Sequence, residues 1–378
     1  MRDNQTPAVG IGSKQLQEQI AAARMRLHAK LINLDLKSLQ ISEYIQRHLN
    51  KYIANLKGAL QLYGRLLYLC LNNRQGFPNK AVLVDYGGGC GIISLLAAEM
   101  GIGTVIYNDI YDVSCTDVGS ISKALGLKLD HIVCGDVDDL ISYVQAHAIC
   151  INAIVSYDVI EHIYDVESHF SKLGLLADHE FRIVYASGAN SANPKNVRLV
   201  KKEQIDAEYK SRDKKWGHKD RDTLQAFLDV RKNIIAAYAP DLSLEVVEQL
   251  ARSTRGLIQR DIEKCVDEFR LKGRIMYQMD HPTNTCDPYT GNWCEHLMDF
   301  DWLEEIIRKA GFAGEIMAGC YNSYGSYPKK IAKISLNAMI KILGRRSMFM
   351  APYYVVYATF SEKGAGKDGN SAPLSNRR

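Results

Sequence analysis

The chain has 378 residues, of which 47% are hydrophobic, and its formal net charge is +4 at pH 7. This length allows one large domain with insertions or two domains, and the composition is typical of a protein with a sizeable core. The small net charge does not indicate a nucleic-acid binder. No uncharged apolar run is long enough to cross a bilayer, so no membrane span is expected.

The N-terminus and the cysteines indicate a compartment. Residues 1–14 are polar and lack the apolar segment of a signal peptide. The nine cysteines are scattered along the chain, and Cys70, Cys134 and Cys150 lie in apolar runs. This arrangement predicts reduced, buried thiols in a cytoplasmic protein rather than a disulfide framework.

The N-terminal part of the chain predicts helices. Apolar residues recur at helical spacing from Leu16 to Leu34, and the same pattern continues from Ile41 to Leu71. Residues 72–78, which include a glycine and a proline, break the pattern and predict a linker.

Strand-like and helix-like segments then alternate up to residue 187. This alternation predicts an α/β fold with a parallel, doubly wound sheet of the Rossmann-like type. The predicted strands lie near 81–86, 104–108, 131–134, 152–157 and 181–187, with helices near 91–100, 114–125, 137–146 and 165–177.

The pattern changes after Ser187. Residues 196–274 are charged and helical, and a loop-like segment follows. A helix is predicted from Asp301 to Ala310, ending at Gly311, and it is followed by a strand, a helix and a last strand over 314–320, 329–343 and 353–360. The expected division is a helical N-terminal segment (1–75), a ligand-binding core (78–190), a helical insertion acting as a substrate lid (191–298), the rest of the core (299–361) and a disordered tail (362–378).

A glycine-rich loop is the most informative motif. A strand ends in Asp85, glycines follow at alternate positions, and an apolar helical pattern begins after them. Such a strand–loop–helix unit is where α/β sheets bind nucleotides. Asp85 would repel a pyrophosphate but would attract a ligand that carries ammonium and sulfonium groups. The loop residues predicted to meet the ligand are Gly87, Gly88, Gly89 and Gly91.

Acidic residues also follow the next strands. Asp109 ends the second strand, where an acid can accept both hydrogen bonds of a ribose diol. Asp136 follows the third strand and is placed to accept a hydrogen bond from an adenine amine, and Asp158 ends the fourth strand at the crevice. The predicted cofactor-binding residues of these strands are Asp109, Ile110, Asp136, Val137, Tyr157 and Asp158.

On these motifs the chain resembles a class I S-adenosylmethionine (SAM)-dependent methyltransferase, over about residues 80–190 by motif and 301–360 by pattern. The run from Asp158 to His162, Asp-Val-Ile-Glu-His, is similar to the fourth motif of a subgroup that includes quinone and other small-molecule methyltransferases. The resemblance implies SAM as the cofactor, and a closing antiparallel strand at 353–360 that inserts into the sheet.

Three other functions are alternatives to this one. NAD binding fits less well, because the glycines follow Gly-x-Gly-x-Gly and an acid precedes them. An RNA or protein methyltransferase is an alternative, although Ser156 to Val159 stand where many nitrogen methyltransferases carry Asn-Pro-Pro-Tyr. A non-catalytic SAM-binding scaffold is a third alternative, which the intact set of acids does not favour.

Two histidines are candidate general bases for methylation of a hydroxyl. His162 follows the fourth strand at the mouth of the predicted site, and His296 lies just before a late helix. The spacing of His281, Cys286, Cys294 and His296 lacks the Cys-x2-Cys pair of common zinc sites, so no metal site is expected.

The acceptor is expected to be a small molecule or a glycan-type compound that is methylated at oxygen. An excess of basic residues over 195–221, with Tyr209 and Trp216 among them, indicates either a solvated helix face or attraction of an anionic acceptor. The oligomeric state is not indicated. The residues proposed for the acceptor pocket are Tyr157, Tyr185, Asn190, Asn193, Tyr289 and Trp293.

The segment from Lys329 to Arg346 carries six basic residues, no acidic ones and a helical apolar pattern. A basic amphipathic helix can lie on an anionic membrane. The neighbouring strands favour a second interpretation, in which the apolar side packs on the sheet.

Overall fold

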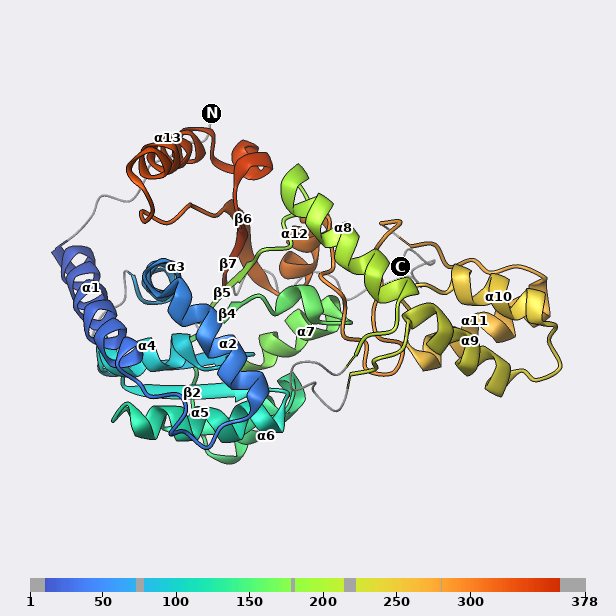
Figure 1. Ribbon diagram of the computed structural model, residues 1–378, viewed down its shortest axis with the longest axis horizontal. Helices are drawn as coiled ribbons and strands as arrows, with labels where there is room; N and C mark the ends of the chain where they lie inside the picture. Colours follow the sequence, from blue (N-terminus) through green and yellow to red (C-terminus); the bar gives the residue numbers. More distant parts are fainter. Residues whose placement is uncertain (1–10, 73–77, 178–180, 214–221, 280, 361–378) are drawn as a thin grey trace.

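The computed structural model describes residues 11–72, 78–177, 181–213, 222–279 and 281–360. Within these residues seven strands form one sheet, in the order β3-β2-β1-β4-β5-β7-β6 (Figure 1). The first five strands are parallel, and β7 lies between β5 and β6, antiparallel to both. The predicted Rossmann-like sheet with an inserted antiparallel last strand is therefore confirmed. The strands are β1 (Val82–Tyr86), β2 (Thr104–Asp109), β3 (His131–Cys134), β4 (Ala153–Tyr157), β5 (Arg182–Ser187), β6 (Phe312–Ala318) and β7 (Tyr354–Phe360).

Helices cover both faces of the sheet, which explains why its central strands carry apolar residues toward both faces. Successive side chains of a strand point to opposite faces, so Leu83 belongs to one hydrophobic core and Val84 to the other. The first face is covered by α1 (Ile11–Ile32), α3 (Leu56–Leu71), α4 (Ile92–Met100) and α5 (Asp112–Ala124), and the second by α6 (Val137–Ala146), α7 (Val166–Leu173) and α12 (Phe300–Lys309).

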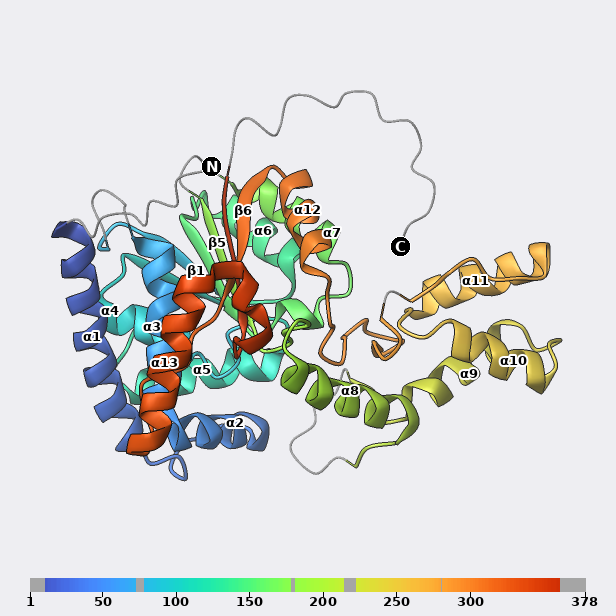
Figure 2. The ribbon, with the colours of Figure 1, turned by 90° about the horizontal axis from the view of Figure 1, so that it is seen from above.

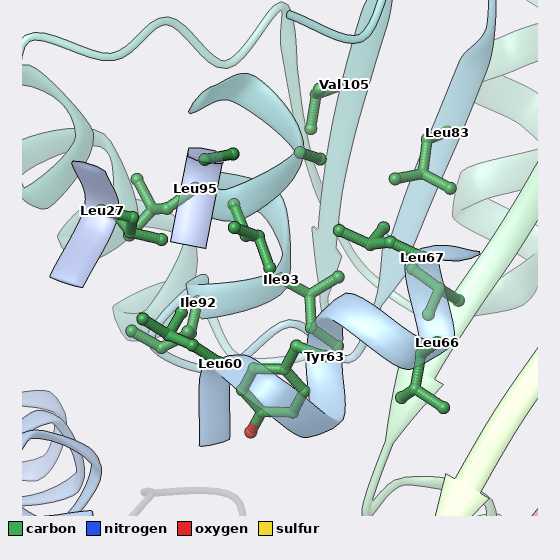
Figure 3. Close-up of a cluster of buried hydrophobic side chains, with 14 of the residues drawn as sticks. Leu27, Leu60, Tyr63, Leu66, Leu67, Leu83, Ile92, Ile93, Leu95 and Val105 are labelled. Atoms are coloured by element: carbon green, nitrogen blue, oxygen red, sulfur yellow. The ribbon is translucent and has the colours of Figure 1, made fainter. Parts of the chain in front are cut away.

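The N-terminal helices are part of the main core. Figure 3 shows Leu60 and Tyr63 of α3 packed beside Ile92 and Ile93 of α4, with Leu83 of β1 nearby. The same segment contains α2 (Glu43–Ala54), and its helical character agrees with the sequence pattern. The proposed linker residues 73–77 and the proposed tail 362–378 lie outside the described residues.

The insertion forms a helical lobe. It contains α8 (Pro194–Tyr209), α9 (Phe227–Tyr238), α10 (Leu244–Ser253) and α11 (Gln259–Lys272). Helices α9 to α11 share a small hydrophobic core of their own and project to one end of the molecule, away from the sheet (Figures 1 and 2).

Two expectations from the sequence are wrong. Cys134 and Cys150 are exposed rather than buried, while Cys70 is buried as expected. Helix α13 (Tyr327–Leu343) does not pack its apolar side on the sheet, because Ile340 is the one fully buried residue among its described members. None of the described helices is long and apolar enough to cross a membrane.

Candidate functional site

A cleft of about 1000 Å³ lies at the carboxyl ends of β1, β2 and β4. Crevices at this edge are the usual ligand sites of open α/β sheets. Helices α2 and α3 line one side of the cleft, and residues 290–292 together with Glu295 line another. The residues predicted for the cofactor that line it are Asp85, Gly87, Gly88, Gly89, Asp109, Ile110, Asp136, Val137, Tyr157 and Asp158.

The glycine loop has no room for a side chain at Gly87, Gly88 or Gly91. Gly87 has a φ of +68°, and a Cβ there would lie 2.5 Å from a methyl carbon of Val159. Gly91 has a φ of +76°, and its Cβ would lie 2.4 Å from Val118. Gly91 caps the N-terminus of α4 and does not itself line the cleft. The loop therefore presents backbone to the cleft, as close approach to a ligand requires.

Asp85 lies at the floor of the cleft and is almost completely buried. Its Oδ2 accepts hydrogen bonds from the backbone nitrogen of Ser94, at 2.9 Å, and from the Ser94 hydroxyl, at 2.7 Å. Burial raises the pKa of the Asp85 carboxyl to about 7, although the bonds from Ser94 oppose the shift. Asp85 thus holds the first turn of α4 through Ser94, and its carboxyl group also gives the floor of the cleft an acidic group.

Asp109 is held with both carboxylate oxygens engaged by backbone. Oδ2 accepts from Gly89 N, and Oδ1 accepts from Tyr111 N, each at 2.9 Å. Each oxygen has a second lone-pair direction, so the pair still suits a diol. Ile110 beside it is 41% exposed, which gives the cleft an apolar surface next to the acid.

Asp136 is the N-cap of α6. Its side chain accepts from Asp138 N and Asp139 N, and the Asp139 side chain accepts in turn from Asp136 N. Asp136 is exposed at the cleft, whereas Val137 is buried beneath it. The capping bonds orient the Asp136 carboxyl on the rim of the cleft.

Asp158 directly follows β4, and its backbone geometry is unusual. Its φ is +54°, a region that non-glycine residues rarely adopt and that often marks functional sites. Its Oδ1 accepts from Gly188 N at 2.9 Å. The surrounding protein and the nearby Glu295 raise the pKa of the Asp158 carboxyl to about 6, although its side chain faces the open cleft.

His162 lies beside the carboxylate of Glu295, and both residues line the cleft. Its Nδ1 lies 2.8 Å from the Trp293 carbonyl oxygen, and because a carbonyl only accepts, Nδ1 carries a proton. In the neutral ring Nε2 then holds the lone pair, and it lies 3.7 Å from Oε1 of Glu295. This tautomer suits proton acceptance at the cleft.

Glu161 sits behind this pair. It is completely buried, and both of its carboxylate oxygens lack a hydrogen-bond partner within the part of the chain that the structure describes. Burial and the neighbouring Asp158 hold the pKa of Glu161 well above its usual range, which favours the neutral acid. Among the described residues, Glu161, His162 and Glu295 are the group whose ligand atoms lie close enough to hold a metal ion, within 4.8 Å of one another.

The helical insertion positions Glu295, which sequence reasoning missed. Glu295 has a φ of +53°. Its carbonyl accepts a hydrogen bond from Gln204 of α8 at 2.9 Å, and the same amide donates to Asn284. Burial and Glu203 raise the pKa of the Glu295 carboxyl to about 7. A lone glutamate in a loop gave no sequence signal, because its place depends on this long-range network.

His296 does not reach the cleft. Its ring stacks on Trp293, with centroids 4.2 Å apart, and burial lowers its pKa to about 4. His281, Cys286, Cys294 and His296 are not part of the cluster formed by Glu161, His162 and Glu295. His296 therefore packs against Trp293 outside the cleft, whereas His162 lies in the cleft beside Glu295.

Most of the residues proposed for the acceptor pocket lie outside the cleft. Of that set, only Tyr157 lines the cleft. Tyr185 is buried and bonded to His169, while Asn190 and Asn193 bind backbone carbonyls near Ala351. The other two proposed residues do not line the cleft either: Tyr289 is exposed elsewhere on the surface, and Trp293 is buried.

Tyrosines from the N-terminal helices take their place. Tyr63 packs on Tyr157 with ring centroids 5.4 Å apart, and Tyr52 packs on Tyr63 at 6.1 Å. Arg65 of α3 also lines the cleft. In the sequence these residues belong to a helical pattern that carries no ligand-binding motif. The packing of α3 on the sheet brings them to the site.

The cleft is more acidic than basic. Six carboxylate residues line it, against two lysines and one arginine. None of the described residues of the basic stretch 195–221 lines it, and Trp216 falls outside the described residues. Residues 195–213 therefore do not line the cleft.

Comparison with known proteins gives no family assignment. No family model matches the chain, and no curated protein matches it. Among solved structures, it is similar to an SAM-dependent methyltransferase from Mesorhizobium loti, with 12% identity over 78% of this chain and 95% of the other, at a TM-score of 0.38. A provisionally assigned SAM-dependent methyltransferase from Listeria monocytogenes has 11% identity over 82% and 100%, at 0.40. At these identities and TM-scores the likeness assigns no activity to this chain.

Proposed function

We propose that the chain is a SAM-dependent methyltransferase that acts at oxygen on a small-molecule or glycan-type acceptor. The observation that carries the proposal is the convergence of a glycine loop and three strand-end acids on one cleft. In this assignment the loop 87–91 takes the methionine part, Asp109 the ribose, and Asp136 with Val137 the adenine. The pocket volume of about 1000 Å³ has room for a cofactor and an acceptor together.

The charge of the cleft supports a cationic cofactor over a dinucleotide. Asp85, Asp109 and Asp158 surround the glycine loop, and each would repel a pyrophosphate. A ligand with a sulfonium and an ammonium group is attracted by the same carboxylates. The cradle without Cβ atoms at Gly87 fits either ligand, so the acids decide between them.

SAM, when bound, supplies a methyl group on a sulfonium that leaves as a neutral thioether without an acid. The protein then has to position the acceptor in line, exclude water and remove a proton from a hydroxyl. His162 is proposed as the base, because its Nδ1 is fixed by the Trp293 carbonyl and its Nε2 faces the cleft. Glu295 at 3.7 Å would stabilise the protonated ring.

The acceptor side of the cleft favours a compact, polar and ring-shaped acceptor. Tyr52, Tyr63 and Tyr157 form a wall of rings with hydroxyl groups, which suits stacking on a sugar or an aromatic ring. The surplus of acids in the cleft does not favour a polyanionic acceptor such as RNA.

Two experiments test the proposal in separate steps. Calorimetry should show SAM binding, and Asp109→Ala should weaken it by about 1.5–3 kcal/mol, the range for hydrogen bonds to a charged group. Asp112→Ala, on the exposed first turn of α5, is the matched control and should not change the affinity. Transfer of a labelled methyl group to fractions of a cell extract then tests catalysis. Binding without any transfer would favour the scaffold alternative, and NAD binding in place of SAM would overturn the cofactor.

A further inference from the structure

Helix α13 presents an apolar stripe to solvent. Tyr327, Ile331, Ile334, Ala338 and Ile342 recur at the three- and four-residue spacing of a single helix face. Exposed fractions on this face are large, at 79% for Tyr327, 47% for Ile331, 54% for Ile334 and 82% for Ile342. Surface helices of globular proteins turn such a stripe inward, so this stripe is oriented for a partner.

Contacts on the opposite face of α13 keep the apolar stripe turned toward solvent. Ile340 is buried, and the Asn337 side chain bonds to both backbone groups of Tyr321, at 2.8 and 2.9 Å. Lys333 donates to Asn322 and to the Tyr324 carbonyl. The helix cannot turn its stripe inward without breaking these contacts. Figures 1 and 2 show α13 on the outside of the molecule, on the side of α1 and α3.

Basic residues flank the stripe. The segment 329–346 has six lysines and arginines and no acid. Lys329, Lys330 and Lys341 are exposed along the helix, and Arg346 is exposed just after it. Phe349, in the turn after the helix, is 54% exposed as well. An apolar ridge with basic flanks is the combination that binds an anionic lipid surface.

We propose that α13 docks the protein on an anionic membrane, with the apolar stripe among the acyl chains and the lysines at the headgroups. A second copy of the chain is a poorer occupant, because pairing two such helices would bring their positive charges together. A peptide partner would be expected to use a groove, whereas this surface is a convex ridge.

The docking surface adjoins the cleft. Tyr321 and Asn322, which α13 holds, also line the cleft. This step rests on the proposed function. Under that function, the acceptor reaches the site from the membrane surface, as a lipid or a lipid-linked glycan would.

Flotation with lipid vesicles tests the docking without any acceptor. The full chain should float with phosphatidylcholine vesicles that contain phosphatidylglycerol and not with phosphatidylcholine alone, and added salt should weaken binding. Ile331→Asp combined with Ile342→Asp should reduce binding by at least about a hundredfold, because both buried isoleucine contributions are lost and two negative charges are added. Lys330→Gln and Lys341→Gln should each reduce it by about fivefold, which corresponds to about 1 kcal/mol per charge.

Leu271→Asp is the matched control, since Leu271 is 84% exposed on the distant helix α11 and should not affect flotation. SAM affinity, measured on the same samples, should be equal in all variants, which separates a failure of docking from a failure of the proposed function. The proposal is overturned if the wild-type chain does not float or if the double variant floats equally well. It is also overturned if the wild-type chain does not bind vesicles and light scattering shows that it is a dimer, whereas the double variant is a monomer.

Discussion

Nε2 of His162 lies 3.7 Å from Oε1 of Glu295, although the two residues are far apart in sequence. The 3₁₀ turn Ile160–His162 after β4 supplies the histidine, and the loop held by α8 supplies the glutamate. A protonated imidazole in this position is stabilised by the carboxylate, so the pair is suited to taking a proton from an acceptor hydroxyl.

His162→Gln should lower turnover by about 10² to 10⁴, the range for loss of a positioned general base, with little change in SAM affinity. Labelled methyl transfer measures the first quantity and calorimetry the second. His296→Phe keeps the ring that stacks on Trp293 and should retain activity. Equal turnover in His162→Gln and the parent would remove His162 from the mechanism.

The affinity for SAM should fall as the solution becomes acidic. Burial raises the pKa of Asp85 to about 7 and that of Asp158 to about 6. A bound cation favours the ionised carboxylates, so protonation of either acid removes attraction. The dissociation constant should therefore rise from about pH 8 to about pH 5, by up to tenfold per pH unit for each linked proton.

S-adenosylhomocysteine provides the control for this dependence, because it lacks the sulfonium charge. Its affinity should change less over the same pH range when both ligands are titrated by calorimetry. If both ligands showed the same pH profile, the acids would not be acting on the sulfonium.

The two glycines that flank α4 offer a matched pair of substitutions. Gly91 and Gly101 have nearly equal φ values, +76° and +75°, but a Cβ at Gly91 would lie 2.4 Å from Val118 while nothing lies within 4 Å of one at Gly101. Gly101→Ala should reduce the free energy of unfolding by about 1–2 kcal/mol, the cost of the left-handed backbone. Gly91→Ala should cost about 1–3 kcal/mol more, from overpacking.

Urea denaturation measures both changes. Gly91→Ala should also weaken SAM binding, because the loop 87–91 must shift to admit the new methyl group. Similar losses in the two variants would mean that the contact with Val118 relaxes freely.

The sequence predicts the parts of the fold that depend on local pattern. The strand 82–86 and the loop after it were predictable, because β-branched runs, alternate glycines and strand-end acids act within a few residues of one another. The order of the acids along the chain also placed Asp109 and Asp158 at one edge of the sheet, because the carboxyl ends of parallel strands meet there.

The rest of the site depends on contacts between distant segments. Tyr63 reaches the cleft through the packing of α3 on α4, and Glu295 reaches it through Gln204. The amphipathic pattern of 329–343 could not say which way its apolar face would turn. Side-chain bonds from Asn337 and Lys333 to the loop before the helix decide that direction.

A buried ion pair stabilises the loop that carries Glu295. Arg231 of α9 and Glu208 of α8 are both buried and paired, and Arg231 also donates to the Ala251 carbonyl. Glu208 in turn accepts from the Thr285 hydroxyl at 2.7 Å, and this connects the pair to the loop. Arg231→Met should lower the free energy of unfolding by about 3–5 kcal/mol, because it removes the closer cation from a buried carboxylate, whose other cation, Arg255, lies 3.8 Å away.

The neighbouring residue on α9 gives the control. Lys232 pairs with Glu248 at 2.5 Å, but both side chains are about one-third exposed, so Lys232→Met should cost no more than about 1 kcal/mol. SAM affinity should be nearly unchanged in both variants, since the glycine loop rests on the sheet and not on the insertion. Turnover should fall in Arg231→Met alone, as the displaced loop moves Glu295 away from His162. A variant with full stability and turnover would show that the insertion holds Glu295 by other contacts.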